Sequence, residues 1–298
     1  MNPAVATMLA AAGRSVDSFP ADFASALMSG KVTLEVLKRY LALESHFFLR
    51  LFWGYQGMRE RLMADTSFPV KMAIELGIGL FCKLAAEKTK RADNFWKEAD
   101  FVLANVIMAL IADFMLTWLP APTLSFTRGK AATGALAKAF AGCPDNAFQK
   151  VQPGMDGFSV TQRAGAVLRN GLKLLGVGFG ASMFGVGLTN VLASIKMQLD
   201  PTWSPPNQPQ NVVGTSAAYG VYMSVSSNLR YQIIAGVIEE RGIEVLFKGN
   251  PSLCHALSFA ARTANTFVGS LLWVDFVRLC GMQKGALAEE AGEKRAAK

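Results

Sequence analysis

The 298-residue sequence has little charge for its length. Charged side chains make up 17% of the residues and hydrophobic ones 51%, whereas an average soluble domain is about one quarter charged. The mean hydropathy is +0.27. This composition argues against a disordered chain and disfavours an ordinary soluble enzyme. The net charge of +8 points to an anionic partner, and the apolar bulk favours lipid over nucleic acid.

Residues that hold metals or act as nucleophiles are also scarce. The four cysteines lie far apart without a CxxC pair, and His46 and His255 are the only histidines. A metal site needs clustered ligands, so we predict no metal, no cofactor and no disulfide framework. The string GASMF is not a GxSxG elbow, and a loose GxGxxA at residues 176–181 follows no strand signal. We therefore expect no catalytic residues and no enzyme.

The two ends of the chain are expected to be poorly ordered. Residues 1–30 are rich in Ala and Ser and lack the continuous apolar core of a secretory signal. They are read as a leader, either the remnant of an organellar transit peptide or a frayed segment. Residues 284–298 form a charged, Ala-rich tail that we predict to be disordered.

An amphipathic helical region is predicted over residues 31–98. Between Thr33 and Asp65, apolar residues recur at spacings of three and four, with interruptions expected near Gly54 and Gly57. The opposite face is basic, so this helix either lies on a membrane surface or packs its apolar face against the rest of the protein. The apolar stretch 67–86 contains two lysines and a glutamate, and is expected to be half-buried or interfacial.

Long hydrophobic runs follow, and they define the predicted fold. A helix rises 1.5 Å per residue, so about 20 apolar residues cross a hydrocarbon layer about 30 Å thick. We predict an all-α polytopic membrane protein whose membrane domain, residues 99–283, contains a polar loop at 123–169. About four spans are expected, near residues 100–119, 172–195, 212–238 and 256–280.

Two of these runs have unusual features. Glycines are frequent between residues 174 and 195, and the pairs Gly176/Gly180 and Ala181/Gly185 predict a close helix-packing face. The third run exceeds one upright span, so its helix either tilts or breaks near the string SSNLR at residues 226–230.

Ionisable and amide side chains within hydrophobic runs are costly and are therefore candidate binding residues. The predicted substrate-binding residues are Asp113, Asn228, Arg230, Glu239, Arg262 and Asp275. Carboxylates would contact a cationic group, whereas arginine would contact a carboxylate. The alternative is that these charges neutralise each other, for example Arg230 with Asp113 or Arg262 with Asp275.

Several long strings resemble one plant and algal family. They are CPDNAFQ (143–149), LRNGLKLLGVGFGAS (168–182), SAAYGVYMSVSSNLRYQIIAGVIEERGIE (216–244) and NTFVGSLLWVDFVRL (265–279). Together with MADTSFPVK and FWKE in the first half, they resemble the RETICULATA-related proteins over about 250 of the 298 residues. The front of the chain departs from that family's pattern, where a longer transit peptide and a Gly-rich or acidic stretch are expected.

The resemblance implies a protein of the chloroplast envelope, in its inner membrane, linked to leaf mesophyll development. It also implies transport of amino acids, basic ones in particular, and no enzymatic activity. Two hypotheses follow: a carrier of small metabolites, or a structural subunit that holds together an envelope complex. The expected partners are the lipid bilayer, a small-molecule substrate, and further copies of the chain or envelope proteins, with no nucleic acid.

Overall fold

The computed structural model describes residues 1–126, 134–154, 156–203 and 211–282, and it contains helices and no strands in these ranges. The predicted all-α class is confirmed. Contacts divide the chain into two units. Unit 1 comprises residues 1–72, 119–169 and 232–255, and unit 2 comprises residues 73–118, 170–231 and 256–298. The charged tail predicted at 284–298 lies outside the described residues.

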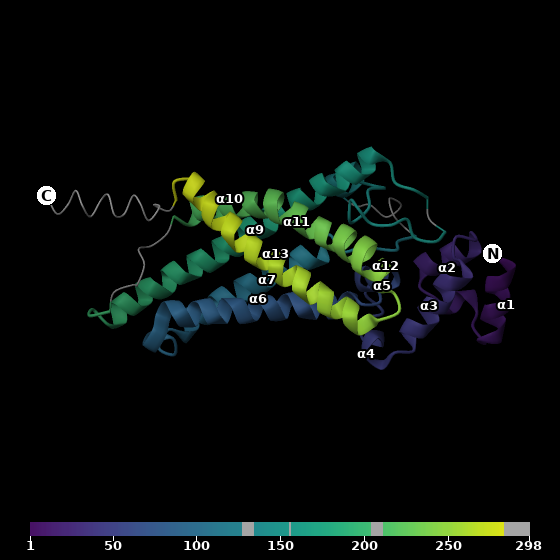
Figure 1. Ribbon diagram of the computed structural model, residues 1–298, viewed down its shortest axis with the longest axis horizontal. Helices are drawn as coiled ribbons and strands as arrows, with labels where there is room; N and C mark the ends of the chain where they lie inside the picture. Colours follow the sequence, from purple (N-terminus) through teal and green to yellow (C-terminus); the bar gives the residue numbers. More distant parts are fainter. Residues whose placement is uncertain (127–133, 155, 204–210, 283–298) are drawn as a thin grey trace. The chain divides into compact units, whose positions relative to one another are not determined.

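Unit 1 begins with a series of short helices (Figure 1). They are α1 (Pro3–Ala11), η1 (Val16–Ser18), α2 (Ala21–Met28), α3 (Leu34–Glu44), α4 (Phe47–Arg50) and α5 (Gln56–Ala64). Side-chain oxygens cap two of them: Asn2 accepts the backbone N–H of Ala4, and Thr33 accepts that of Val36. Such caps satisfy N–H groups that the first helical turn leaves without a partner.

The apolar face predicted between Thr33 and Asp65 turns inward. Val36, Leu37 and Tyr40 of α3 are buried in one core with residues of α1, α2 and α5. The core-facing alternative therefore describes α3. The helix is also more broken than the sequence indicates, because α3 ends at Glu44 and a non-helical stretch at 51–55 separates α4 from α5.

Residues 1–30 are part of this core. Val5 and Leu27 are almost completely buried, and the ring of Phe23 packs 4.3 Å from the ring of Tyr40, centroid to centroid. The expectation of a frayed segment is wrong here, because most of the large apolar side chains among the alanines pack into the core that also contains α3.

The rest of unit 1 pins an irregular segment to a helix. It contains α8 (Ala135–Ala139), the start of α9 (Val160–Leu199), η4 (Ile234–Ile243), which is π-helical, and α12 (Glu244–Leu246). Asn146 is fully buried and donates its amide hydrogens to the carbonyl oxygens of Pro120 and Gln232, at 2.8 and 3.0 Å. The Gln232 side chain in turn accepts the backbone N–H of Ala147. The CPDNAFQ string thus has a structural role in fixing this segment.

Unit 2 is built from long helices. They are most of α6 (Phe68–Arg91), η2 (Ala92–Asn94), α7 (Ala99–Trp118), α9 from residue 170, α10 (Val212–Tyr222), η3 (Met223–Ser227), α11 (Asn228–Ile233) up to residue 231, and α13 (Pro251–Leu279) from residue 256. The chain from Val212 to Leu246 is helical throughout, and η3 is a π-helical stretch within it. The helix therefore does not break near the SSNLR string. It widens into a π-helical stretch that includes the first two residues of that string. Such stretches are frequent at functional sites.

Glycines of α9 make close helix contacts at one predicted position, Gly185, and at two others, Gly171 and Gly178. A methyl group at Gly178 would lie 3.0 Å from Cα of Gly220, and one at Gly171 would lie 3.1 Å from the carbonyl oxygen of Ser224. Gly185 faces Met108 of α7 in the same way. Gly176 and Gly180 have open space beside them, so this predicted pair packs against no other helix in the described part of the chain. The contacting glycines recur every seven residues, which is two helical turns and keeps them on one face.

Two helices are long and apolar enough to cross a membrane by length and composition, namely α7 and α9, within the part of the chain described. The predicted count of about four spans is thus not confirmed by this criterion. The third run is divided by π-helical stretches, and α13 carries three charged residues. Most residues of both candidate spans are not buried within the protein.

Candidate functional site: buried charges under an apolar surface

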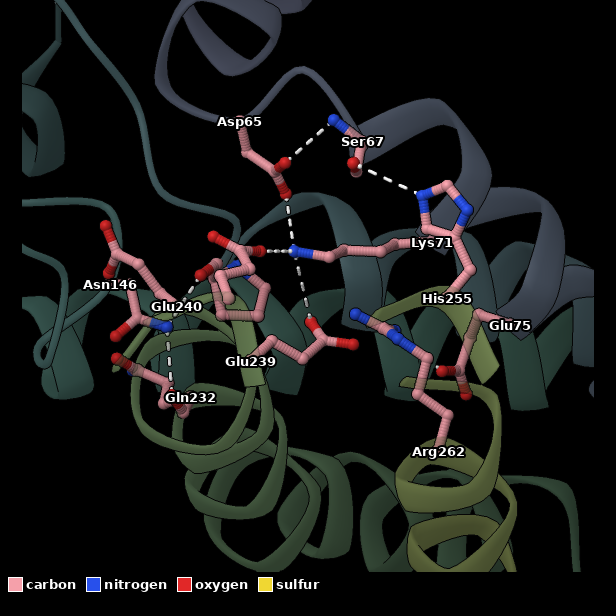
Figure 2. A network of polar contacts seen from close by, with 12 residues as sticks. Asp65, Ser67, Lys71, Glu75, Asn146, Gln232, Glu239, Glu240, His255 and Arg262 are labelled. Carbon is pink, nitrogen blue, oxygen red and sulfur yellow. Dashed lines mark hydrogen bonds and ion pairs between the residues drawn. The ribbon is translucent and has the colours of Figure 1, made fainter. Parts of the chain in front are cut away.

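Unit 2 buries an ion pair that sequence analysis did not identify. Arg262 of α13 lies 2.8 Å from the carboxylate of Glu75 of α6, and the two residues are 2% and 1% exposed. The hydroxyl of Tyr231 on α11 donates to the other carboxylate oxygen. Figure 2 shows Arg262 and Glu75 extending toward each other from their two helices. This arrangement neutralises both charges and joins three helices of the unit.

The pair of Arg262 with Asp275 considered from the sequence does not form. Both residues belong to α13, and thirteen positions along a helix correspond to roughly 20 Å. The Asp275 side chain is 74% exposed, with Arg278 3.9 Å away. Asp275 therefore lies apart from the buried charges, whereas Arg262 is among them.

Arg230 makes several hydrogen bonds, all of them to uncharged groups. Its guanidinium donates to the side-chain oxygen and the backbone oxygen of Asn265, at 2.7 and 3.0 Å. It also contacts the hydroxyl oxygens of Tyr222, at 3.3 Å, and Ser227, at 3.2 Å. No carboxylate pairs with Arg230 in the described part of the chain, so the proposed pair with Asp113 is absent and the positive charge has no counter-ion.

Asp113 is the complementary case, a carboxylate without a cation. It is half-buried in the middle of α7, one of the two candidate spans. A Cβ atom at Gly79 of α6 would lie 1.9 Å from its Oδ2 atom, so the carboxylate rests directly against the glycine backbone. Among the described residues, Asp113 forms no hydrogen bond or ion pair. Among the described residues of unit 2, Arg230 and Asp113 are therefore two charges of opposite sign that no ion pair compensates.

The two remaining predicted residues are buried, in different units. Asn228 of α11 is 1% exposed and lies beside Gly171 of α9 in unit 2. Glu239 of η4 is also 1% exposed and belongs to unit 1, where it lies 3.8 Å from the ammonium group of Lys71. Five of the six predicted residues belong to unit 2, on the three helices α7, α11 and α13, and Glu239 alone belongs to unit 1.

Lys71 is the centre of a second charged cluster, in unit 1. Its ammonium group contacts Asp65, at 2.7 Å, and Glu239 (Figure 2). It also contacts the carboxylate of Glu244. Burial by itself would lower the pKa of Lys71, but the attraction of the three carboxylates outweighs burial and raises that pKa. The lysine is therefore held in its charged form. His255 Nε2 lies 3.3 Å from the Ser67 hydroxyl in the same unit.

Glu240, next to Glu239 on η4, is buried beside an irregular segment. Burial raises its pKa to about 7, although its carboxylate accepts the backbone N–H of Lys150 at 3.0 Å. A raised carboxyl pKa means that the folded protein binds the proton more tightly than the unfolded chain does. The stabilisation by the protonated Glu240 carboxyl is therefore complete below pH 4.5, the ordinary pKa of glutamate, and disappears as the pH rises through about 7.

We expect Glu240→Gln to remove this pH dependence. In the parent protein, the contribution of Glu240 to the free energy of unfolding should fall by on the order of 2–3 kcal/mol between pH 4.5 and 7. The neutral amide of the Glu240→Gln variant should abolish that fall. The measurement is denaturant unfolding in detergent at several pH values. Glu35→Gln, at a residue whose side chain is 69% exposed, is the matched control. Identical pH profiles for the parent and the Glu240→Gln variant would contradict this reading.

The outer surface of unit 2 is apolar where its interior is charged. Glu75, Asn228 and Arg262 are buried, whereas large apolar side chains on α7, α9 and α13 point outward. The exposed ones include Leu103 (60%), Phe184 (61%), Val191 (55%), Phe267 (66%) and Leu271 (53%). Soluble proteins place such residues inside, and large exposed apolar patches mark interaction surfaces.

A groove on this surface has no polar lining. It encloses ≈ 480 Å³ between α6 and α7, and its walls include Leu76, Leu80, Ile107, Ile111 and Phe114. Gly77 opens it on the α6 side, because no atom lies within 4 Å of where its Cβ would be. Among the described residues, no group of three or more His, Cys, Asp or Glu side chains could hold a metal ion.

Fold and site together define a helical protein in which unit 2 buries an ion pair and exposes apolar side chains on its long helices. Comparison with known proteins gives its family. A profile of the RETICULATA-like family, described as "Protein RETICULATA-related", matches residues 60–237. The chain belongs to the RETICULATA-related family, as the strings quoted above predict. The match covers both candidate spans and the residues Glu75, Asp113 and Arg230. No solved structure matches the chain.

Three relatives from Arabidopsis thaliana illustrate the similarity. The chain is 46% identical to "Protein RETICULATA-RELATED 4, chloroplastic", over 93% of this chain and 72% of that protein. It is 38% identical to "Protein RETICULATA-RELATED 5, chloroplastic", over 94% of this chain and 39% of that protein. It is 32% identical to "Protein RETICULATA, chloroplastic", over 89% and 62%. The chain thus spans less than two thirds of the length of the last two.

Proposed function

We propose that this chain is a helical membrane protein of the chloroplast envelope, in the inner membrane, that transports small metabolites and catalyses no reaction. The relatives' names place those proteins in the chloroplast. The membrane part of the proposal rests on unit 2, which buries the charged pair Glu75 and Arg262 and exposes leucine, valine and phenylalanine on its long helices. A bilayer solvates such a surface, and water does not. We propose four membrane spans, near residues 100–119, 172–195, 212–238 and 256–280.

Transport is supported by the two uncompensated charges of unit 2. Arg230 is bonded only to uncharged groups, and Asp113 has no partner in the described residues. Isolated charges in a membrane are expensive, so they are retained where they bind a charged solute or ion. A solute with both a carboxylate and an ammonium group, such as an amino acid, would compensate one charge with each end. Lysine and arginine are the substrates proposed first.

Proteoliposome exchange tests this proposal. Purified protein in liposomes preloaded with lysine should take up labelled lysine faster than empty liposomes, and Asp113→Asn should reduce the initial rate at least tenfold because the ammonium group loses its counter-ion. Asp93→Asn, at an exposed residue of η2, is the matched control and should keep the parent rate. Uptake at the rate of protein-free vesicles by a correctly folded parent would reject transport of lysine.

A structural role in an envelope complex is the second candidate. The observation that favours it is the apolar groove between α6 and α7, together with the Glu75–Arg262 pair, which neutralises itself without a solute. A scaffold would present such a groove to a neighbouring helix. Native-size separation of detergent extracts distinguishes the two hypotheses, because a scaffold should migrate with a defined partner and a carrier should migrate as a single chain or a homo-oligomer.

A further inference from the structure

Unit 1 has an exposed aromatic segment at residues 46–55, which comprises α4 and the turn that follows it and is called the aromatic loop below. Within ten residues, Phe47, Phe48, Leu51, Phe52 and Tyr55 have exposed fractions of 82, 72, 81, 51 and 63%. No other stretch of this length in the described part of unit 1 exposes as many large apolar side chains. An apolar surface of this kind is unfavourable in water and indicates an interaction site.

The loop is held in place by the side chains between the exposed ones. Trp53 is 6% exposed, and its ring packs 4.9 Å from that of Tyr40 in the core of unit 1. Leu49 packs against the same core, and Arg59 donates to the carbonyl oxygen of Trp53 at 3.1 Å. The buried residues therefore fix the backbone while the aromatic rings face outward. The exposure follows from the fold and is not that of a loose loop.

Positive charge accompanies the exposed rings. Arg50 lies among them and is exposed, and Lys38 on the preceding helix is also exposed. The nearby Glu44 is paired with Arg14 at 2.7 Å and so does not offset these cations. Aromatic and leucine side chains interleaved with arginine are typical of segments that enter the interface of an anionic bilayer, where the rings sit among headgroups and the cations contact phosphates.

A second exposed apolar set next to a lysine lies in unit 1, at the end of α12. Val245, Leu246 and Phe247 are 53, 75 and 36% exposed, and the exposed Lys248 follows them directly. Protein interfaces are depleted of lysine, whereas the exposed Lys38 and Lys248 accompany these two apolar sets. This second set makes a bilayer the better fit than a protein partner for the aromatic loop.

We propose that the loop at residues 46–55 docks unit 1 onto the surface of an anionic lipid bilayer by inserting Phe47, Phe48, Leu51 and Phe52 among the headgroups. This rests on the proposed membrane location of the chain, but it does not require transport. Unit 1 would then be held against the membrane rather than suspended in the aqueous phase.

Spin labels on the full chain test the docking. The exposed Cys82 and Cys280 and the half-buried Cys254 are replaced by Ser. A single nitroxide is then attached at Phe48→Cys, at Ala11→Cys on an exposed position of α1, or at Leu103→Cys in α7. The protein is reconstituted in vesicles of phosphatidylcholine and phosphatidylglycerol. Collisions with oxygen and with a water-soluble nickel chelate are then compared, since oxygen concentrates in lipid.

The label at residue 48 is expected to collide several-fold more with oxygen than with nickel, and the label at residue 11 the reverse. Omitting phosphatidylglycerol should reduce the preference for oxygen at residue 48. Equal nickel access at residues 48 and 11 would overturn the proposal, as would spin–spin broadening at residue 48 that unlabelled protein dilutes, which indicates a second copy. The label at residue 103 reports the span separately, so failure of membrane insertion is distinguished from failure of the loop to dock.

Discussion

Replacing Arg262 by methionine is expected to destabilise the protein by about 3–5 kcal/mol, because Glu75 would remain buried with an unpaired charge. Arg262 and the Tyr231 hydroxyl now both hydrogen-bond to that carboxylate. Of these two bonds, only the one from Tyr231 would remain after the substitution. A loss of this magnitude is a large part of the about 5–15 kcal/mol by which an ordinary domain is stable. The measurement is thermal or denaturant unfolding in detergent, followed by helical circular dichroism.

The double variant Glu75→Gln with Arg262→Met separates charge from packing. It removes both charges while keeping an oxygen that can accept the Tyr231 hydroxyl, so we expect it to recover most of the lost stability. If the single variant unfolds like the parent, Glu75 is not the buried partner of Arg262. If the double variant is as unstable as the single one, the loss comes from packing rather than from an unpaired charge.

Replacing Phe184 by lysine should prevent stable insertion of α9. Phe184 is 61% exposed in the middle of this helix, and a lysine at the centre of a span costs about 2.5–3.5 kcal/mol on insertion scales. In a soluble protein the same change, at an exposed position, would alter stability by less than about 0.5 kcal/mol. The measurement is the fraction of protein that stays with the membrane after an alkaline carbonate wash.

Leu199→Lys is the matched control on the same helix. Leu199 is 80% exposed and is the last residue of α9, where a cation reaches the headgroups and also opposes the negative end of the helix dipole. This variant should remain in the membrane like the parent. Equal behaviour of the two lysine variants would contradict the assignment of residues 172–195 to the bilayer.

The hydrophobic pattern of the sequence predicts the helices of unit 2 well, since each of the helices α7, α9 and α13 coincides with a long apolar run or contains one. It does not predict which glycines touch. Gly176 and Gly178 look equivalent in the sequence, yet only Gly178 faces Gly220, because the contact depends on how α9 is rotated against its neighbour. Packing between distant segments determines this rotation, and local spacing does not.

The charged residues show the same division. The sequence identifies Arg230, Arg262 and Asp113 as costly in an apolar run, which needs no knowledge of the fold. The partners could not be predicted, because Arg262 bonds to Glu75 across 187 residues of sequence. The sequence signal for Glu75 was a carboxylate within the largely apolar stretch 67–86. A lone carboxylate argues against burial, unless the guanidinium that neutralises it is known.

In unit 1 the amphipathic spacing between Thr33 and Asp65 is compatible with a membrane surface and with a protein core. Tyr40 and Leu37 proved to be buried against α1 and α2, which the alanine-rich composition of residues 1–30 conceals. Period alone cannot distinguish the two environments, because both present an apolar medium to one face of the helix.

Photochemical labelling from lipid tails tests the central claim, that the apolar surface of unit 2 is in contact with acyl chains. The full chain is reconstituted in vesicles containing a phospholipid with a diazirine in its tail, irradiated, digested and mapped by mass spectrometry. We predict adducts on outward residues of three helices, such as Leu103, Phe184 and Leu271, and none at the buried Glu75 or Asn228. Adducts absent from all three helices, in a chain that stays dispersed without detergent, would contradict the account.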